Sequence, residues 1–404
     1  MAKKNRAKRR EGASVPRFEH DRLPRIALLI ETSNEYGRRL LLGIRDYVRE
    51  HEPWSFQLGE QARGHTVPSW LSKWKGDGII ARIDNASIEQ AVREVGVPVV
   101  NVSASGFGLA FPTVISDSEA IAQTAADHLL ECGFSQFGYC GDPRFAWSKS
   151  HERHFKQYLQ QRGFSCHCFS GSKSAANHWG RALEELIGWV RELPKPIGIM
   201  ACYDLRGQQL LAACREAGIH VPDEVAVIGQ HNDETICEFC DPPLSSVIPN
   251  PRLAGYLGAS LLDRMLKGEW IPGGVYRVPP IGIAVRRSTD VVAVPDEDVS
   301  AAIRYIRDHA CQGIDVRDVV HAVNISRSML ERKFKRYLNC NPHDLIVRTQ
   351  LRRAQELLIQ TDLTIENVAT LSGFSSAEYM SCVFHRRVGQ SPRDFRKRCR
   401  GKLL

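Results

Sequence analysis

The stretch IENVATLSGFSSAEYMSCVFHRRVG, residues 365–389, decides how the C-terminal quarter of the chain folds. It predicts a short helix, a turn at Ser372 and Gly373, and a second helix. Gly373 suits the turn because glycine tolerates positive φ. Ser375 and Glu378 have the S-x-x-E spacing of a capping box, so we expect them to begin the second helix.

The second helix has one apolar face and one exposed face. Its apolar face carries Met380, Val383 and Phe384, which we expect to point toward a core. The opposite face carries the residues that could contact a partner, namely Ala377, Glu378, Ser381, Cys382, His385 and Arg386. A short helix, a tight turn and a second helix with an exposed polar face are typical of a helix-turn-helix unit.

The same pattern stands about fifty residues earlier, in VRDVVHAVNISRSMLERKFKRYLNC, residues 316–340. Ser326 is a suitable N-cap for its second helix. Leu330, Phe334 and Leu338 recur every four residues and predict the buried face. The exposed face then carries Arg327, Ser328, Glu331, Arg332 and Lys335.

A helix that begins at Asn341-Pro342 and runs to about residue 360 separates the two units, and Ser391-Pro392 begins a last, basic helix. Two such units on a stiff spacer can place their second helices about one DNA turn, ~34 Å, apart. The alternative is a small helical bundle whose basic face is only solvated. The paired motif is more specific than a run of charge and favours binding to double-stranded DNA.

The block GFSSAEYM, VF, GQSP and FR, within residues 365–396, resembles the signature of AraC-type transcription regulators. The resemblance covers about 100 residues. It implies that the exposed positions of both second helices contact DNA bases. The chain departs from the family at Cys382, where an arginine is common, which implies no strong arginine–guanine contact there.

Charge supports a basic C-terminal module. The chain has 404 residues and a net charge of +8. Residues 1–25 carry +6 and residues 300–404 carry +9, whereas residues 26–299 carry −7. We therefore predict four parts: a basic disordered arm over 1–24, an acidic domain over 25–290, a linker over 291–300 and a DNA-binding domain over 301–404.

The acidic domain alternates short apolar runs with helical patterns, beginning with RIALLI at residues 25–30 and a helix at 36–51. This alternation is typical of parallel sheets with right-handed crossovers. Ten predicted strands are too many for one small sheet, so we predict two doubly wound α/β lobes with a ligand cleft between them. The C-terminal domain should be all-α.

Other chemistry has weak support. The chain has twelve scattered cysteines, and no apolar run approaches the ~18 residues of a membrane span, which indicates a cytoplasmic protein with free thiols. Cys237, Cys240 and nearby His231, and the run Cys166-His167-Cys168, form no second zinc-type pair, so we expect no metal. No nucleotide fingerprint or nucleophile elbow occurs, so we expect no cofactor and no enzyme.

Over nearly its whole length after the arm, the chain resembles the xylose operon regulators. These combine a LacI-type, periplasmic-binding-protein-like sensor with a C-terminal AraC-type domain. The resemblance rests on RIALLIETSNEYGRRLLLGI (25–44), DGIIARID (77–84), VPVVNVS (97–103), PPIGIAVRRSTD (279–290) and IRYIRDHACQGIDV (303–316). It implies a sugar effector bound in the cleft, a homodimer, and RNA polymerase as a partner if the regulator is an activator.

Sugar sites combine planar polar side chains with an aromatic face. Candidates near the ends of predicted strands and at the following helix starts are Tyr36, Arg38, Asp84, Asp117, Trp147, Arg153, Asp204, His231 and Asn232. The chain departs from the xylose regulators at three places: Gly37 replaces an aspartate, His231 replaces an acidic residue, and His151 stands near a usual arginine. These departures leave the effector open.

The sequence thus predicts a sugar-responsive transcription regulator. The alternative that it leaves open is a solute-binding protein without a transcriptional role.

Overall fold

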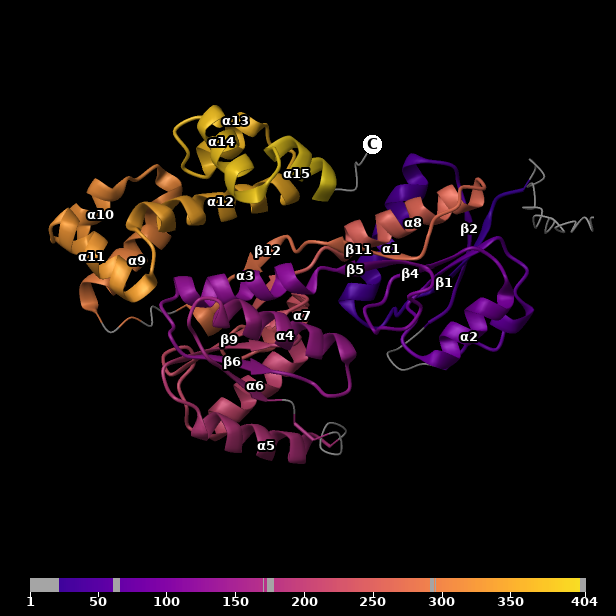
Figure 1. Cartoon of the computed structure of the whole chain (residues 1–404), viewed down its shortest axis with the longest axis horizontal. Helices are drawn as coiled ribbons and strands as arrows, with labels where there is room; N and C mark the ends of the chain where they lie inside the picture. The colour runs from indigo at the N-terminus through magenta and orange to yellow at the C-terminus, as the bar shows by residue number, and fades with distance from the viewer. Residues whose placement is uncertain are drawn as a thin grey trace, which may run out of the picture.

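The computed structural model describes residues 22–60, 66–169, 171–172, 178–290, 294 and 296–399. Figure 1 shows two α/β lobes and an all-helical domain that follows them in the chain. No helix in the described residues is long and apolar enough to cross a membrane. The predicted arm lies outside the described residues except for its last three, where Arg22 donates a 2.8 Å hydrogen bond to Asp77.

The N-terminal lobe holds a six-stranded parallel sheet in the order β11-β5-β4-β3-β1-β2. Its strands are β1 (Arg25–Leu29), β2 (Ser55–Leu58), β3 (Gly78–Ala81), β4 (Val99–Asn101), β5 (Pro112–Ser116) and β11 (Gly274–Val278). Its helices are α1 (Glu35–Glu50), η1 (Leu71–Lys73), α2 (Ala86–Val95) and α8 (Pro251–Leu266). Helices α1 and α8 pack together over one apolar cluster.

The C-terminal lobe holds a second six-stranded sheet in the order β12-β10-β9-β8-β6-β7. Its strands are β6 (Phe137–Cys140), β7 (Cys166–Phe169), β8 (Ile197–Ala201), β9 (Val225–Gln230), β10 (Ser245–Ile248) and β12 (Gly282–Ala284). Its helices are α3 (Ser118–Glu131), α4 (Ala146–Gln160), α5 (Trp179–Glu192), α6 (Asp204–Glu216), α7 (Glu234–Phe239) and η3 (Arg287–Thr289). Strand β12 is antiparallel to β10, and the other pairs are parallel.

The chain passes between the lobes three times, at β5–α3, at β10–α8 and at β11–β12. Central strands such as β3 and β8 are buried along their whole length, because helices cover both faces of a parallel sheet. The crossings put the carboxyl ends of the strands of both sheets beside one another. Open α/β sheets bind ligands at these ends of their strands.

The helical domain contains α9 (Glu297–His309), η4 (Ala310–Gln312), α10 (Val316–Val323), α11 (Arg327–Leu338), α12 (Pro342–Gln360), α13 (Ile365–Leu371), α14 (Ala377–Val388) and α15 (Pro392–Cys399). Two separate apolar clusters form its cores, one around Phe334 and one around Phe384. Helix α12 contributes to both clusters and joins the two halves of the domain, as the spacer prediction required.

The two-lobed α/β fold and the all-α domain confirm the predicted fold class. Several details of the prediction were wrong. Strands β5 and β10 and helix α7 were not predicted, because each is short and lacks a long apolar period. The sequence also predicts a helix near residues 68–75, where the structure has only a single 3₁₀ turn. Helix α9 begins at Glu297, inside the stretch that we predicted to be a linker.

The helical domain contacts the C-terminal lobe through α3 and α12. Glu131, at the last position of α3, lies 3.7 Å from Arg348 and 3.6 Å from Arg352, both on α12. Arg307 of α9 donates a hydrogen bond to the Cys132 thiol, 3.0 Å away. Figure 1 shows α12 running above α3. Ion pairs, as well as the chain connection, therefore hold the helical domain against the C-terminal lobe.

Candidate functional site

A pocket lies between the two lobes at the carboxyl ends of the strands. The N-terminal lobe contributes residues of α1, of β5 and of the segments after β3 and β4, and the C-terminal lobe contributes residues of the start of α3, of α4 and of the end of β9. The lining consists of Tyr36, Arg82, Val102, Ala104, Ile115, Ser116, Ser118, Trp147, His151, Gln230 and His231. We call this the inner cavity.

Three lining residues carry a buried polar atom that has no hydrogen-bond partner among the described residues. These atoms are Nε of Arg82, Nδ1 of His151 and Oε1 of Gln230. Buried polar atoms in proteins are almost always hydrogen-bonded, because an unmade bond costs about 1–3 kcal/mol. Their convergence on one cavity indicates that a polar ligand completes these bonds.

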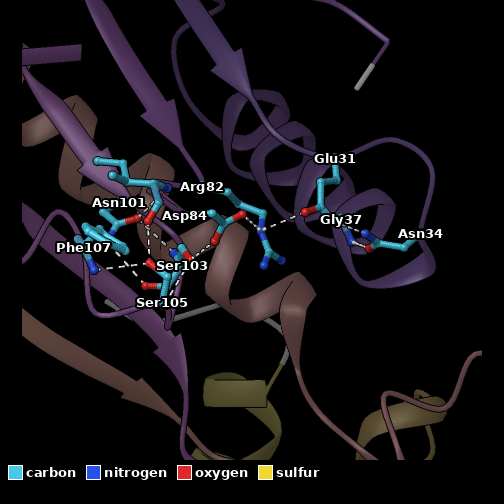
Figure 2. A network of polar contacts seen from close by, with 10 residues as sticks. Glu31, Asn34, Gly37, Arg82, Asp84, Asn101, Ser103, Ser105 and Phe107 are labelled. Atoms are coloured by element: carbon cyan, nitrogen blue, oxygen red, sulfur yellow. Dashed lines mark hydrogen bonds and ion pairs between the residues drawn. The ribbon is translucent and has the colours of Figure 1, made fainter. Parts of the chain in front are cut away.

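Arg82 is held in place from two sides. Its Nε lies 3.7 Å from Asp84 and 4.0 Å from Glu31, and its guanidinium carbon is 5.6 Å from the centre of the Tyr36 ring. Figure 2 shows the guanidinium between the two carboxylates, with its terminal nitrogens directed away from both of them. Asp84 is itself hydrogen-bonded to Ser103. The arrangement orients a forked donor toward the cavity.

An aromatic wall closes the C-terminal-lobe side. Trp147 stacks on Phe145 with ring centres 5.0 Å apart, and it contacts Tyr203 and His231 at 5.9 Å each. Phe145 directly precedes α4 and Trp147 lies in its first turn, so the start of one helix supplies most of the wall. A flat aromatic surface beside unpaired polar atoms suits a sugar ring, which has apolar faces and polar edges.

His151 faces the cavity from α4 as a neutral imidazole. Burial lowers its pKa to about 3, and the nearby charge of His154 adds to the effect. A neutral imidazole has one donor nitrogen and one acceptor nitrogen. It can therefore exchange hydrogen bonds with a hydroxyl, which also both donates and accepts.

The structure brings together some of the residues that the sequence singled out as effector contacts. Tyr36, Trp147 and His231 line the inner cavity. Asp84 does not line it and acts through Arg82. Asp117 caps α3 by accepting from the backbone of Glu119 and Ala120.

Two predicted contacts point elsewhere. Arg38 is exposed and bonds to Glu35 and to the carbonyl of Thr32. Arg153 is exposed on α4, on a different face of the helix from His151. Helical spacing explains the second error, because residues two apart on a helix do not share a face.

Asp204 and Asn232 are buried and hold the loop that carries His231. Asp204 accepts hydrogen bonds from the Ser246 hydroxyl, at 2.6 Å, and from the backbone of Asp233, at 2.8 Å. Asn232 accepts from Arg286 at 2.9 Å. His231 and Asn232 both have positive φ, at 102° and 49°. These buried bonds stabilise a strained turn, so both residues act through the position of His231.

Sequence reasoning missed Arg82, Gln230 and Ser116 as lining residues, and it noted His151 only as a departure from the family. Arg82 directly follows the buried strand β3, and Gln230 is the last residue of the buried strand β9. Residues at these places commonly contact ligands in open α/β sheets. Ser116 was missed because strand β5 was missed. It hydrogen-bonds the Tyr36 hydroxyl at 2.9 Å.

Gly37 stands where the resemblance implies an aspartate. A Cβ added to Gly37 would lie 1.9 Å from the carbonyl oxygen of Glu31. The loop between β1 and α1 therefore closes too tightly on the helix to admit any side chain here.

The first helix-turn-helix unit is formed by α10 and α11. Ser326 caps α11 by accepting from the backbone of Met329, as predicted. Leu330 and Phe334 are fully buried, and Leu338 is half-buried. The predicted contact residues of α11 are all exposed, and Arg327 forms a 2.8 Å ion pair with Glu331.

The second unit is formed by α13 and α14. The predicted cap was wrong by one residue: Ser376 caps α14 by accepting from the backbone of Tyr379 at 3.1 Å, and Ser375 lies in the loop before it. Glu378, Cys382 and Arg386 are exposed, whereas Ala377 and Ser381 are half-buried.

Gly373 forms the turn of the second unit with φ of 79°. An added Cβ would lie 2.4 Å from the carbonyl oxygen of Ala310, so the turn also packs directly against the backbone of η4. Gln350 of α12 donates to the carbonyls of both Gly373 and Ala310. The turn, the spacer helix and the first half of the domain are thus bonded at one point.

Three protein-family models match the chain. A XylR N-terminal domain matches residues 25–113, a periplasmic binding protein-like domain matches residues 126–289, and a helix-turn-helix domain matches residues 319–398. The matches fall on the N-terminal lobe, the C-terminal lobe and the two helix-turn-helix units.

Full-length relatives agree with these models. The chain is 34% identical to a xylose operon regulatory protein of Escherichia coli (strain K12), over 92% of this chain and 96% of that protein. It is 32% identical to the xylose operon regulatory protein of Haemophilus influenzae, over 93% and 98%. A solved structure of a xylose-binding transcription activator is similar with a TM-score of 0.61 and 33% identity, covering 94% of this chain and 99% of that one.

Proposed function

The chain belongs to the family of xylose operon regulatory proteins, AraC-type DNA-binding transcription regulators with a sugar-sensing domain, and from this premise we propose that it controls a sugar-utilisation operon in response to xylose or a related sugar. Proteins of this family regulate transcription and are not enzymes. The observation that carries the sugar proposal is that three residues lining an aromatic-walled cavity between the lobes each have a buried polar atom without a hydrogen-bond partner among the described residues.

In the proposed complex, the sugar lies in the inner cavity. The terminal nitrogens of Arg82, together with His151 and Gln230, exchange hydrogen bonds with its hydroxyls, which would satisfy the atoms of His151 and Gln230 that lack partners. The face of Trp147 packs against the ring. The Gly37 and His231 departures change two positions that the resemblance assigns to acidic groups, which supports a related sugar as readily as xylose itself.

We further propose that the exposed residues of α11 and α14 contact operator DNA. These are Arg327, Ser328, Glu331, Arg332 and Lys335 in the first unit, and Ala377, Glu378, Ser381, Cys382 and Arg386 in the second. The chain would act in the cytoplasm as a homodimer and would contact RNA polymerase if it activates transcription. A solute-binding protein without a transcriptional role does not account for residues 319–398, which match a helix-turn-helix domain.

The proposed mechanism uses lobe closure. A sugar that contacts both lobes favours their closed arrangement, and it can shift the equilibrium only by its difference in affinity for the two states. Helix α3 begins beside the cavity, where Ser118 lines it, and ends at Glu131 against α12. Closure would therefore move the spacer helix that carries both units.

A thermal-shift screen of pentoses and hexoses tests the sensor part of this proposal. A sugar that binds the folded state raises the melting temperature, and at 100 times its Kd it stabilises the fold by about 2.7 kcal/mol. Gln230→Leu, which removes one unpaired acceptor, should abolish most of the shift, whereas exposed Gln57→Leu on strand β2 should not. If no sugar shifts the melting temperature of the wild-type protein, the sugar proposal is wrong.

A further inference from the structure

A second cavity adjoins the inner one, toward the outside of the cleft. Its lining comes from the loop before α1, the start of α6 and the loop around α7: Ser33, Asn34, Glu35, Tyr36, Tyr203, Asp204, Leu205, His231, Asp233 and Ile236. We call this the outer cavity. Its free volume is about 250 Å³, against about 50 Å³ for the inner cavity. The outer cavity therefore offers space beyond the inner one.

The two cavities share Tyr36 and His231. These rings come from different lobes, and their centres lie 5.4 Å apart. A ligand that occupies both cavities therefore passes along this pair, and the atom that links its two parts lies beside the two rings. The two cavities therefore adjoin at this pair of rings.

Asn34 and Glu35, two polar side chains of the N-terminal-lobe wall of the outer cavity, are already hydrogen-bonded within the protein. Asn34 accepts from the backbone of Gly37 at 2.8 Å and caps α1. Glu35 accepts from Arg38 at 3.0 Å and from Arg39 at 2.7 Å. These groups have little remaining capacity to recognise the hydroxyls of a ligand.

The C-terminal-lobe wall follows the same rule. Asp204 accepts from Ser246 and from the backbone of Asp233, and it is almost fully buried. Asp233 caps α7 by accepting from the backbone of Ile236. The polar side chains here serve the protein's own turns, in contrast with the three unpaired atoms of the inner cavity.

The surface that the outer cavity leaves for a ligand is apolar and aromatic. Leu205, at the second position of α6, is 43% exposed, and Ile236 is half-buried. The rings of Tyr36, Tyr203 and His231 complete this surface. A partner that covers Leu205 and Ile236 would remove apolar surface from water and gain hydrophobic stabilisation.

From this contrast we propose that the effector is a glycoside with an aromatic aglycone, whose sugar ring occupies the inner cavity and whose aromatic ring covers Leu205 and Ile236 in the outer cavity. The proposal rests on the proposed function and adds the ligand class to it. Burying an aromatic ring against such a surface contributes roughly 1.5–3 kcal/mol, which is about a tenfold to hundredfold gain in affinity.

The experiment compares glycosides that differ only in the aglycone. Isothermal titration of the full-length protein uses D-xylose, methyl β-D-xyloside, phenyl β-D-xyloside and the disaccharide xylobiose, with the same set for any other sugar that stabilises the fold. We expect the phenyl glycoside to bind at least tenfold more tightly than the methyl glycoside of the same sugar. The change in heat capacity on binding should be more negative for the phenyl glycoside, because it buries more apolar surface.

Variants locate the effect. Leu205→Ser should remove most of the phenyl advantage while the affinity for the methyl glycoside changes less than twofold. Leu58→Ser provides the matched control, because Leu58 is 44% exposed on the edge strand β2 and lies outside both cavities. It should leave both affinities unchanged.

Each outcome decides something. Equal affinity for methyl and phenyl glycosides overturns the aromatic-aglycone proposal and leaves the sugar sensor intact. Tighter binding of xylobiose than of the phenyl glycoside overturns it in favour of a second sugar ring. Failure of every sugar and glycoside to bind overturns the sugar sensor itself, and with it this proposal.

Discussion

At the scale of single residues, the site is defined by buried polar atoms that have no hydrogen-bond partner among the described residues. The sequence drew attention to charged and aromatic residues, but the atoms that indicate a ligand belong to Arg82, His151 and Gln230. Their neighbours hold them ready: Glu31 and Asp84 flank the arginine, and the α4 backbone holds the histidine beside Trp147. Burying a polar atom without a hydrogen-bond partner lowers the free energy of unfolding, so these residues destabilise the unliganded protein and leave their atoms available to a ligand.

The titration of His151 should make the stability of the protein depend on pH. Its folded-state pKa, about 3, lies below the ordinary value of 6.5, so the unfolded state binds the extra proton between these values. The contribution to stability is fully present above pH 6.5 and is lost as the pH falls toward 3, by up to about 1.4 kcal/mol per pH unit. Urea denaturation of the wild type and of His151→Gln at pH 5, 6 and 7 measures the difference.

Asp204 supplies a control of opposite sign. Burial raises its pKa to about 7 against the ordinary 3.8, so the folded state holds the extra proton between these values. Its contribution is present below pH 4 and is lost as the pH rises through 7. The stability difference between wild type and Asp204→Asn should therefore fall as the pH rises, whereas the difference for His151→Gln should rise. Equal slopes for the two variants would contradict both assignments.

At the scale of elements, the two helix-turn-helix units follow rules of capping and periodicity. Ser326 caps α11 and Ser376 caps α14. Asn324 ends α10 and Gly373 follows α13, and both have positive φ. The units differ in the chemistry that they expose. Among their proposed contact residues, α11 presents Arg327, Arg332 and Lys335, whereas α14 presents Arg386 and has the uncharged Cys382 where the resemblance implies an arginine. We infer that α11 supplies more of the direct base recognition.

Two substitutions on α11 distinguish base contacts from phosphate contacts. Arg332→Ala should weaken binding to the operator by about 1–3 kcal/mol and relax base preference at one position, if Arg332 binds a base edge. Lys335→Ala should weaken binding to all sequences alike and reduce the salt dependence by about one phosphate contact. Fluorescence anisotropy with operator and scrambled DNA at several salt concentrations separates the two effects.

Both side chains are exposed on the same helix, so each variant is the control for the other. The assignment of Arg332 to a base would be refuted by an Arg332→Ala protein that keeps its ratio of operator to scrambled-DNA affinity.

At the scale of the whole molecule, one helix joins the ligand cavity to the DNA-binding domain. Helix α3 follows the β5 crossing between the lobes, and its first residue, Ser118, lines the inner cavity. Its last residue, Glu131, lies between Arg348 and Arg352 of the spacer helix. Burial raises the pKa of Glu131, and the two arginines oppose that rise. The pairing fixes the spacer helix relative to the sensor.

Glu131→Gln should weaken the coupling between sugar and operator while leaving the sugar site intact. Coupling energies of this kind are typically about 1–3 kcal/mol, so a several-fold effect of sugar on operator affinity should shrink toward one. The sugar affinity of the DNA-free protein should not change. Operator binding measured with and without saturating sugar gives the coupling, and sugar binding measured with and without operator must give the same factor.

Glu192→Gln, at the exposed end of α5, is the matched control and should preserve the coupling. An undiminished sugar effect in Glu131→Gln would show that the signal reaches the DNA-binding domain by another route.

The sequence by itself determined the fold class, the division into an acidic sensor and a basic helical domain, and the two helix-turn-helix units. These depend on periodicity, capping and charge, which are local properties that neighbouring residues express. It also placed Tyr36, Trp147 and His231 at the site, because residues at strand ends and helix starts meet at one edge of a parallel sheet.

Only the tertiary structure decided which polar atoms face the cavity and which serve the protein. Asp204 and Arg82 both follow a strand closely. The carboxylate of Asp204 accepts hydrogen bonds from Ser246 and from the backbone of Asp233, whereas the Nε of Arg82 lacks a hydrogen-bond partner among the described residues. That difference arises from partners more than twenty residues away in the chain. Long-range packing sets such contacts, and no local pattern records them.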